Sequence, residues 1–428
     1  MNLPAGHQRS STLVPAKALL RDDRSLLWVA LALLVASRLT LIFMIDVQPT
    51  SDMGWYYQRA IDLVESGQYA EDGVPTAYWP VGYAAFLAGV MVLAGKSVLA
   101  GQLANLVLSL FCMLLLYRLS MRHFGDDPRV ATFAVCLLAV YPNHMGYSLG
   151  LYSEPLYTAL LLLMWMLIKP DARAVALIAA GIVAGLATLV KAQMLLLAPL
   201  LIFVLSMQAW SRQATVSALK NTVLATAVMV LTIAPWTLRN HLVMGAFIPV
   251  STNGGMSLLA GNNPSVTFDL RTDYNDSDPI FQQVNFSVAD QVAADRRARA
   301  AAWDWISANP ITFISLMPKK FIRLWVPDGE SEWNIQRGFA NYEKWQFEFR
   351  LVRIFNQIYY FLLLAGFVFA LLHSVRLREP QTLAMPMTIL FFTALSLVFS
   401  GQSRYHAPLM PFVISYAAWT LARIWPAR

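Results

Sequence analysis

Residues 97–117 of this chain read SVLAGQLANLVLSLFCMLLLY, a stretch without a charged side chain. A helix of about 20 apolar residues is long enough to cross the hydrocarbon core of a lipid bilayer. Similar apolar stretches recur along the chain, and they are too many to be buried together in one soluble core. The sequence therefore predicts an all-α integral membrane protein.

The overall composition supports this prediction. Hydrophobic residues make up 57% of the 428 residues and charged residues only 13%, whereas a soluble domain carries about 25% charged residues. A net charge of +7 would suggest nucleic-acid binding in a soluble protein, but here the basic residues lie mostly between apolar stretches, as in cytoplasmic loops. The two cysteines, Cys112 and Cys136, lie inside apolar stretches, and their spacing predicts no metal site.

The apolar stretches predict about ten spans of a helical bundle. The spans are expected near residues 26–45, 97–117, 129–141, 151–168, 172–190, 194–210, 219–236, 352–373, 383–400 and 407–424. This pattern divides the chain into a tail (1–25), an N-terminal transmembrane module with a first outer loop (26–236, loop 46–96), a long outer region (237–350) and a C-terminal transmembrane module (351–428).

Charge decides the topology around residues 77–94, which are apolar but broken by Pro80 and Gly82. Cytoplasmic loops are enriched in Lys and Arg. Residues 118–129 hold three arginines, and the tail is basic through Lys17, Arg21 and Arg24. Both segments are cytoplasmic only if residues 77–94 do not cross. We therefore predict a juxtamembrane helix there, both termini in the cytoplasm, and the long region on the outer face.

Five charged residues lie at the outer ends of spans, where an ionisable group is by default a functional hypothesis. They are Asp52, Glu154, Lys191, Arg239 and Arg404. A carboxylate can act as a base for a nucleophile, and lysine and arginine can hold a phosphate. Convergence of these residues would favour chemistry on a phosphate-bearing lipid at the outer leaflet.

Simpler roles compete with each assignment. Asp52 can cap the helix that follows it by accepting from the Trp55 amide. Glu154 and Lys191 can form a structural ion pair, and Arg239 can extend toward the membrane surface. Arg404 lies in a tight outer turn, residues 401–406, where a purely structural role is harder to assign.

Aromatic residues gather on the outer side of the first spans, where they can anchor the protein at the headgroup level or form a platform for lipid or sugar. The candidates for such a platform are Tyr56, Tyr57, Tyr78, Trp79 and Tyr83. His144 and His406 are expected to be polar interface residues, because no second His or Cys stands at metal-ligand spacing from either.

Several of these segments, taken in order, resemble the GT-C glycosyltransferases, and most closely the protein O-mannosyltransferase and lipid A aminoarabinose transferase group. The first outer loop carries Ser51-Asp52-Met53-Gly54-Trp55-Tyr56-Tyr57 and Tyr78-Trp79-Pro80-Val81-Gly82-Tyr83. Residues 153–157, 235–240, 309–325 and 403–411 resemble later parts of the same family. Two departures are Met53, where many members carry Glu, and Trp79-Pro80, where the aminoarabinose transferases carry a lysine before two prolines.

The resemblance implies a multi-span GT-C fold and a glycosyltransferase activity, hexosyl or pentosyl, in a bacterial inner membrane with the active site facing the periplasm. It implies an undecaprenyl-phosphate-like sugar donor, an envelope glycan, lipid or protein as acceptor, and inversion at the anomeric carbon. The family's acidic positions fall on Asp52 and Glu154, while Lys191, Arg404 and Arg239 would hold the donor phosphate. No cofactor is implied with certainty, a divalent metal stays open, and no nucleic-acid partner is expected.

Two other function classes remain open on the sequence. A transporter or flippase of a lipid-linked glycan would also bury charges and aromatics, but such proteins commonly show broken helices in matching halves, and this sequence shows no such pairing. A structural subunit of an envelope assembly would tolerate replacement of Asp52 without any change in glycans.

Overall fold

The computed structural model describes residues 23–266, 279–374 and 379–425, so nearly all of the predicted tail lies outside the described residues. The predicted multi-span helical bundle is confirmed. Its ten apolar helices that correspond to the predicted spans are α2 (Asp23–Met44), α5 (Val98–His123), α6 (Pro128–Ala139), α8 (Ser153–Leu167), α9 (Ala174–Val190), α10 (Met194–Ser206), α11 (Arg212–Met244), α17 (Gln346–Ser374), α18 (Ala384–Val398) and α19 (Met410–Ile424).

The helices differ in how well they match the thickness of a bilayer. By length and composition, five segments can cross a membrane on their own: 24–44, 98–123, 212–244, 343–374 and 380–398. The other helices of the bundle are shorter, and they pack into one continuous apolar core. Long helices such as α2 and α11 have many exposed apolar side chains, because lipid rather than protein covers them.

Helix α11 continues beyond residue 236, where the sequence places the end of a span, and ends at Gly245 in a left-handed conformation. The returning chain stabilises this extension. The Trp236 indole donates to Val250 O at 2.7 Å, and the Asn240 amide donates to Ile248 O at 3.0 Å. The helix therefore reaches into the outer region instead of stopping at its edge.

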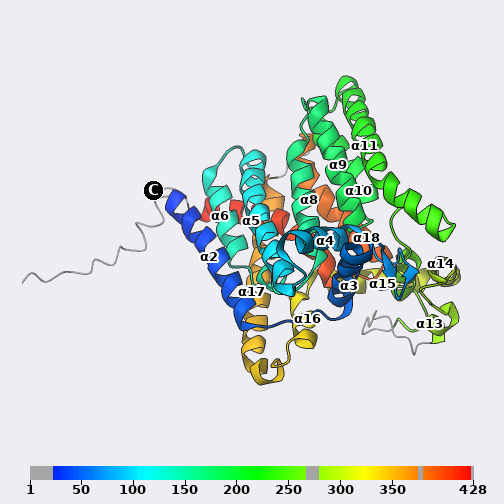
Figure 1. The fold of residues 1–428 in the computed structure, drawn as a ribbon. Coiled ribbons are helices and arrows are strands. Elements are labelled where there is room, and N and C mark those ends of the chain that lie inside the picture. The colour runs from blue at the N-terminus through cyan, green and yellow to red at the C-terminus, as the bar shows by residue number, and fades with distance from the viewer. Residues whose placement is uncertain (1–22, 267–278, 375–378, 426–428) are drawn as a thin grey trace, which may run out of the picture.

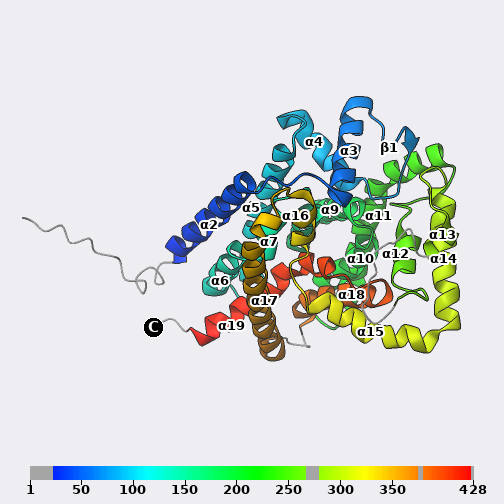
Figure 2. The same ribbon diagram turned by 90° about the horizontal axis from the view of Figure 1, so that it is seen from below.

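Shorter elements lie outside the bundle. They are α3 (Ser51–Ser66), the hairpin β1 (Ala70–Glu71) and β2 (Val74–Pro75), α4 (Gly82–Ala94), α7 (Pro142–Gly146), α12 (Gly254–Ala260), α13 (Pro279–Val284), α14 (Gln291–Ala308), α15 (Pro310–Trp325) and α16 (Ser331–Gly338). Three of them, α12, α13 and α14, share a small core of their own. Figure 1 shows α3, α13 and α16 toward one side of the bundle, and Figure 2 shows α14 and α15 at the end opposite α2. Met256, Leu259, Phe281 and Ala298 belong to the small core.

One glutamine joins the first outer loop to the long outer region. The buried Gln291 side chain accepts from the Ala77 amide at 3.0 Å and from the hydroxyls of Thr76 and Thr252 at 3.2 and 3.1 Å. Its own amide group donates to Pro75 O and Val288 O. Two segments that are far apart in the sequence are thus held as one outer layer over the bundle.

Helix α4 covers the segment whose topology the charges decide. It packs most extensively on α3, with further contacts to α5 and α9. A Cβ at Gly82 would lie 2.6 Å from the Leu189 carbonyl carbon, so the glycine of the Pro80-Val81-Gly82 motif lets α4 begin against the end of α9. Since α6 and α10 are about as short as α4, length alone does not exclude a crossing, and the argument from charge stands.

We expect a topology reporter fused after Gly95 to be periplasmic and one fused after Arg122 to be cytoplasmic. The reason is the arginine cluster at 118–129, which favours the cytoplasm. Paired alkaline phosphatase and green fluorescent protein fusions measure both positions in the same cells. A cytoplasmic signal at Gly95 would show that α4 crosses the membrane.

Candidate active site

A cavity of about 470 Å³ lies where the first turns of α3 and α8 meet the end of α9, helix α16 and the turn before α19. Its lining brings together four of the five charged residues singled out from the sequence. These are Asp52, Glu154, Lys191 and Arg404. Residues from positions 51 to 405 thus share one site, and the convergence expected from the sequence is present in the fold.

Asp52 and Arg404 form an ion pair inside this cavity. The Arg404 Nη1 lies 2.8 Å from Asp52 Oδ2, and about a third of each side chain is exposed. Asp52 occupies the first turn of α3, whose N-cap is Thr50 without a side-chain capping bond. The structure therefore places the carboxylate on Arg404 and not on the Trp55 amide, which was the capping alternative. Burial alone would lower the pKa of Arg404, but Asp52, Tyr405 and Glu154 together outweigh it and raise that pKa.

Glu154 and Lys191 form the second pair, at 3.0 Å, and this pair is more deeply buried, with exposed side-chain fractions of 8% and 17%. Glu154 lies in the first turn of α8, where a carboxylate suits the positive end of the helix. Lys191 is the C-cap residue of α9, at that helix's negative end. The ion pair considered from the sequence is thus present, and it also lines the cavity.

The backbone beside Asp52 is strained. Ser51 has a φ of 50°, a left-handed conformation that costs an L-residue with a side chain about 1–3 kcal/mol. Such conformations persist where the surroundings fix them, and they gather at functional sites. Here the strained residue sets the direction in which the following carboxylate enters the cavity.

Three polar atoms of cavity-lining residues are buried without a hydrogen-bond partner among the described residues. They are Arg404 Nε, Tyr147 Oη and Asn334 Oδ1. Leaving a buried polar group unsatisfied costs about 1–3 kcal/mol. Arg404 is the most informative, because Nη1 binds Asp52 while the Nε donor of the same guanidinium has no partner in the described part of the chain.

The aromatic candidates divide into two groups. Tyr56, Tyr78 and Trp79 line the cavity, and burial, with the nearby charges of Asp52 and Glu154, raises the pKa of Tyr56, so its hydroxyl stays a neutral donor. Tyr57 and Tyr83 lie elsewhere. The Tyr57 hydroxyl donates to Lys96 O at 3.3 Å, and that of Tyr83 accepts from the Asn105 amide at 3.2 Å.

Arg239, the fifth charged candidate, is not among the cavity-lining residues. Its guanidinium donates to Tyr69 O at 2.6 Å and to Thr76 O at 2.8 Å, and it lies over the Trp236 ring. These contacts tie α11 to the first outer loop. Arg239 therefore braces α11 against a loop segment that lies 163 residues away in the sequence.

Sequence reasoning missed the wall of the cavity formed by α16 and its flanks. Glu330, Trp333, Asn334 and Arg337 line the site from this side, and the Arg337 guanidinium lies 3.8 Å from the centre of the Trp333 ring. Charged residues are unexceptional in a polar outer region, so no local pattern separates Glu330 from its neighbour Glu332. Only the Asp-Gly pair at 328–329 marks a turn at this point.

Within the described residues, no group of three His, Cys, Asp or Glu side chains is close enough to hold a metal ion. Asp52 and Glu154 each already face a cation.

Residues 79–238 match the family model of the dolichyl-phosphate-mannose-protein mannosyltransferases. This match covers less than half of the chain, including α4 and the helices that carry Glu154 and Lys191. The chain has the GT-C fold, as its motifs predicted.

Solved structures extend the likeness to the rest of the chain. The archaeal oligosaccharyltransferase AglB from Archaeoglobus fulgidus, in complex with an inhibitory peptide and a dolichol-phosphate, aligns with 95% of this chain at 14% identity and a TM-score of 0.51. The same enzyme in complex with Zn and sulfate aligns with 93% at 15% identity and a TM-score of 0.54. The alignments cover 52% and 49% of those proteins, so this chain spans about half their length.

ArnT from Cupriavidus metallidurans, bound to undecaprenyl phosphate, aligns with 92% of this chain and 78% of its own, at 16% identity and a TM-score of 0.44. Comparison with the sequences of characterised proteins gives no significant match.

The bracing position of Arg239 is directly testable. We expect Arg239→Ala to lower the free energy of unfolding by about 1.5–3 kcal/mol, because carbonyl groups lose a charged donor. A thermal-shift assay compares the variant with the wild type. Unchanged stability in Arg239→Ala would contradict the bracing role.

Proposed function

We propose that this protein is an inner-membrane glycosyltransferase that moves a sugar from a polyprenyl-phosphate donor to an acceptor hydroxyl at the periplasmic face. The observation that carries the proposal is the cavity in which two carboxylate–cation pairs face each other, with a buried donor of Arg404 left unpaired. A phosphate is the ligand that an arginine fork suits best. The lipid-phosphate complexes named for AglB and ArnT concern those proteins, and they agree with this choice of donor.

In the proposed reaction, the donor phosphate lies against Arg404 and Lys191. Nε of Arg404 would bind a phosphate oxygen while Nη1 keeps its bond to Asp52. The acceptor hydroxyl attacks the anomeric carbon as the bond from that carbon to the phosphate oxygen breaks. The electron pair leaves with the lipid phosphate, whose growing charge the two cations stabilise in the transition state.

Asp52 is the proposed base. Its Oδ2 is held by Arg404, which leaves Oδ1 to accept the proton of the acceptor hydroxyl. Glu154, more buried and paired with Lys191, would orient the acceptor and the lysine. One displacement by a hydroxyl inverts the anomeric centre. The neutral hydroxyl of Tyr56 and the faces of Tyr78 and Trp79 would contact the sugar.

We expect Asp52→Asn to fold and bind donor like the wild type but to lose about 10²–10⁴-fold in transfer rate, because asparagine cannot take a proton. Asn still offers an oxygen to Arg404. The assay follows transfer from a panel of radiolabelled undecaprenyl-phosphate sugars to membranes of cells that lack this protein. The matched control is Asp62→Asn on the same helix, where Asp62 pairs with Arg59 and does not line the cavity. Equal rates in both variants would remove Asp52 as the base.

The donor site gives a second prediction. Lys191→Ala and Arg404→Ala should each weaken donor binding by about 1.5–3 kcal/mol, which is about 10- to 150-fold. Arg404→Lys should recover part of the loss, since an ammonium lacks the planar fork. Titration with undecaprenyl phosphate in nanodiscs measures the affinities. A flippase would instead move the labelled lipid across the bilayer with its sugar–phosphate bond intact, and thin-layer chromatography of the lipid distinguishes the two outcomes.

A further inference from the structure

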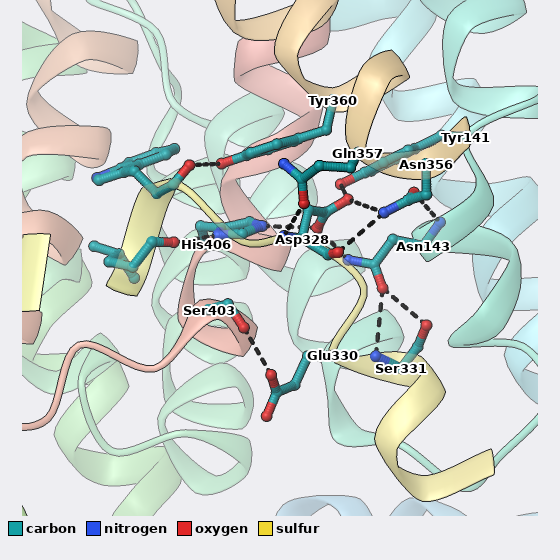
Figure 3. Close-up of polar contacts among 12 residues, drawn as sticks. Tyr141, Asn143, Asp328, Glu330, Ser331, Asn356, Gln357, Tyr360, Ser403 and His406 are labelled. Atoms are coloured by element: carbon teal, nitrogen blue, oxygen red, sulfur yellow. Dashed lines mark hydrogen bonds and ion pairs between the residues drawn. The ribbon is translucent and has the colours of Figure 1, made fainter. Parts of the chain in front are cut away.

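Behind the cavity lies a buried polar cluster around Asp328 and His406. Figure 3 shows Asp328 with His406 on one side and Tyr141, Asn143 and Asn356 on the other. Neither Asp328 nor His406 is among the cavity-lining residues. Both side chains are almost fully buried, at 0% and 1% exposure, so His406 is not the interface residue that its place in an outer turn predicted.

Three side-chain donors converge on the Asp328 carboxylate in addition to the histidine. The Tyr141 hydroxyl donates to Oδ2 at 2.7 Å and the Asn356 amide donates to the same oxygen at 2.9 Å. The Asn143 amide donates to Oδ1. These bonds hold the carboxylate from several sides.

His406 forms a hydrogen bond through each ring nitrogen. Nδ1 lies 2.6 Å from Leu324 O, and Nε2 lies 3.0 Å from Asp328 Oδ1. The ring is also stacked between Trp325 and Tyr360, with centroids 5.7 and 5.2 Å away. These contacts fix both the position and the orientation of the ring.

The end of α15 is part of the same cluster. Helix α15 ends at Trp325, so the last carbonyls have no partner within the helix. His406 caps Leu324 O, the Tyr360 hydroxyl caps Trp325 O at 2.8 Å, and Gln357 caps Val326 O at 2.8 Å. The end of α15 is therefore joined to the histidine and to α17 by side-chain hydrogen bonds.

The pair connects two walls of the cavity. Along the chain, His406 follows Arg404 by two residues in the 3₁₀ segment η3 (Ser403–Leu409). Asp328 precedes the cavity-lining Glu330 by two residues. A second link parallels the first, since the Ser403 hydroxyl donates to Glu330 Oε2 at 2.7 Å (Figure 3).

We propose that the buried, hydrogen-bonded pair of Asp328 and His406 is a positioning device: it locks η3 against the segment before α16 and thereby holds the Arg404 fork where the donor phosphate binds. His406 acts through Arg404 and does not itself touch the substrate. This proposal rests on the proposed function, because it takes Arg404 as a phosphate contact.

A double-mutant cycle on undecaprenyl phosphate binding tests the proposal. We expect His406→Gln to weaken binding about tenfold in the wild-type background, since it disrupts the hydrogen bonds that anchor the turn, and to have no further effect in Arg404→Ala. Interactions that act through one shared residue are non-additive in this way. Asp328→Asn, which replaces the carboxylate at nearly constant volume, should weaken donor affinity in the same way as His406→Gln.

The control is His144→Gln. His144 is a half-buried histidine whose Nδ1 lies 2.9 Å from Arg38 Nη2, so its side chain bonds to α2 and not to η3. A general loss of stability would lower the folded fraction in both histidine variants, but only His406→Gln should change the affinity of the folded fraction. Additive losses in the cycle, or equal losses in His144→Gln, would overturn the proposal.

Hydrogen–deuterium exchange of the ligand-free protein gives a test that does not depend on the donor. We expect faster exchange of the amides in 400–409 and 326–331 in His406→Gln than in His144→Gln. Unchanged exchange in both segments would overturn the locking role. If the wild type binds no undecaprenyl phosphate, the proposed donor is wrong, and the exchange experiment still decides whether the pair holds the turn.

Discussion

The candidate site depends on the pairing of Asp52 with Arg404 across nearly the whole length of the chain. A charge at the edge of a bilayer is expensive unless another charge or a polar group compensates it. Pairing compensates both charges. It also constrains the fold of the outer layer, because the first turn of α3 must lie against the turn before α19 for the pair to form. Glu154 and Lys191 do the same for α8 and α9. Four helix ends are therefore brought to one cavity by two electrostatic contacts.

The positions of these charged side chains depend on further hydrogen bonds around them. Gln291 holds the first outer loop to the long region, and Arg239 braces the same loop against α11. Gly82 lets α4 begin directly against the α9 residues that precede Lys191. A catalytic group is useful only when its neighbours fix its position, and here most of that fixing comes from backbone carbonyls and amides.

The sequence predicts the bundle well because each apolar helix can be recognised from the hydrophobicity of its own residues. Charge at span ends also pointed to four residues of the cavity, since a charged residue near lipid stands out. The Glu154–Lys191 pair was considered from the sequence, whereas the pairing of Asp52 with Arg404 was not. Charge does not single out site residues in a segment that is polar throughout. Glu330 and Arg337 line the cavity, yet nothing in 237–350 distinguishes them from other charged residues. Buried polar pairs were missed for the opposite reason: a histidine such as His406 in an outer turn suggests exposure, and only the packed fold shows that it is buried.

The balance of charge in the cavity bears on how such a site would work. Its lining holds three cations (Lys191, Arg337 and Arg404) and three carboxylates (Asp52, Glu154 and Glu330), so the empty site is close to neutral. A sugar joined to a lipid phosphate is a diester with one negative charge. The departing lipid phosphate is a monoester, which carries about 1.5 to 2 negative charges at neutral pH.

In the proposed reaction, the charge on the phosphate therefore grows as the bond to the sugar breaks. Cations that are already held in place by Asp52 and Glu154 need little rearrangement to meet that growth, and interactions that strengthen toward the transition state are the ones that raise the rate. Because the lipid phosphate product carries more negative charge than the sugar donor, the cations bind the product more tightly than the donor. The carboxylates then have a second use, because they stay paired with Arg404 and Lys191, offset part of the positive charge that holds the phosphate, and so favour its release into the lipid.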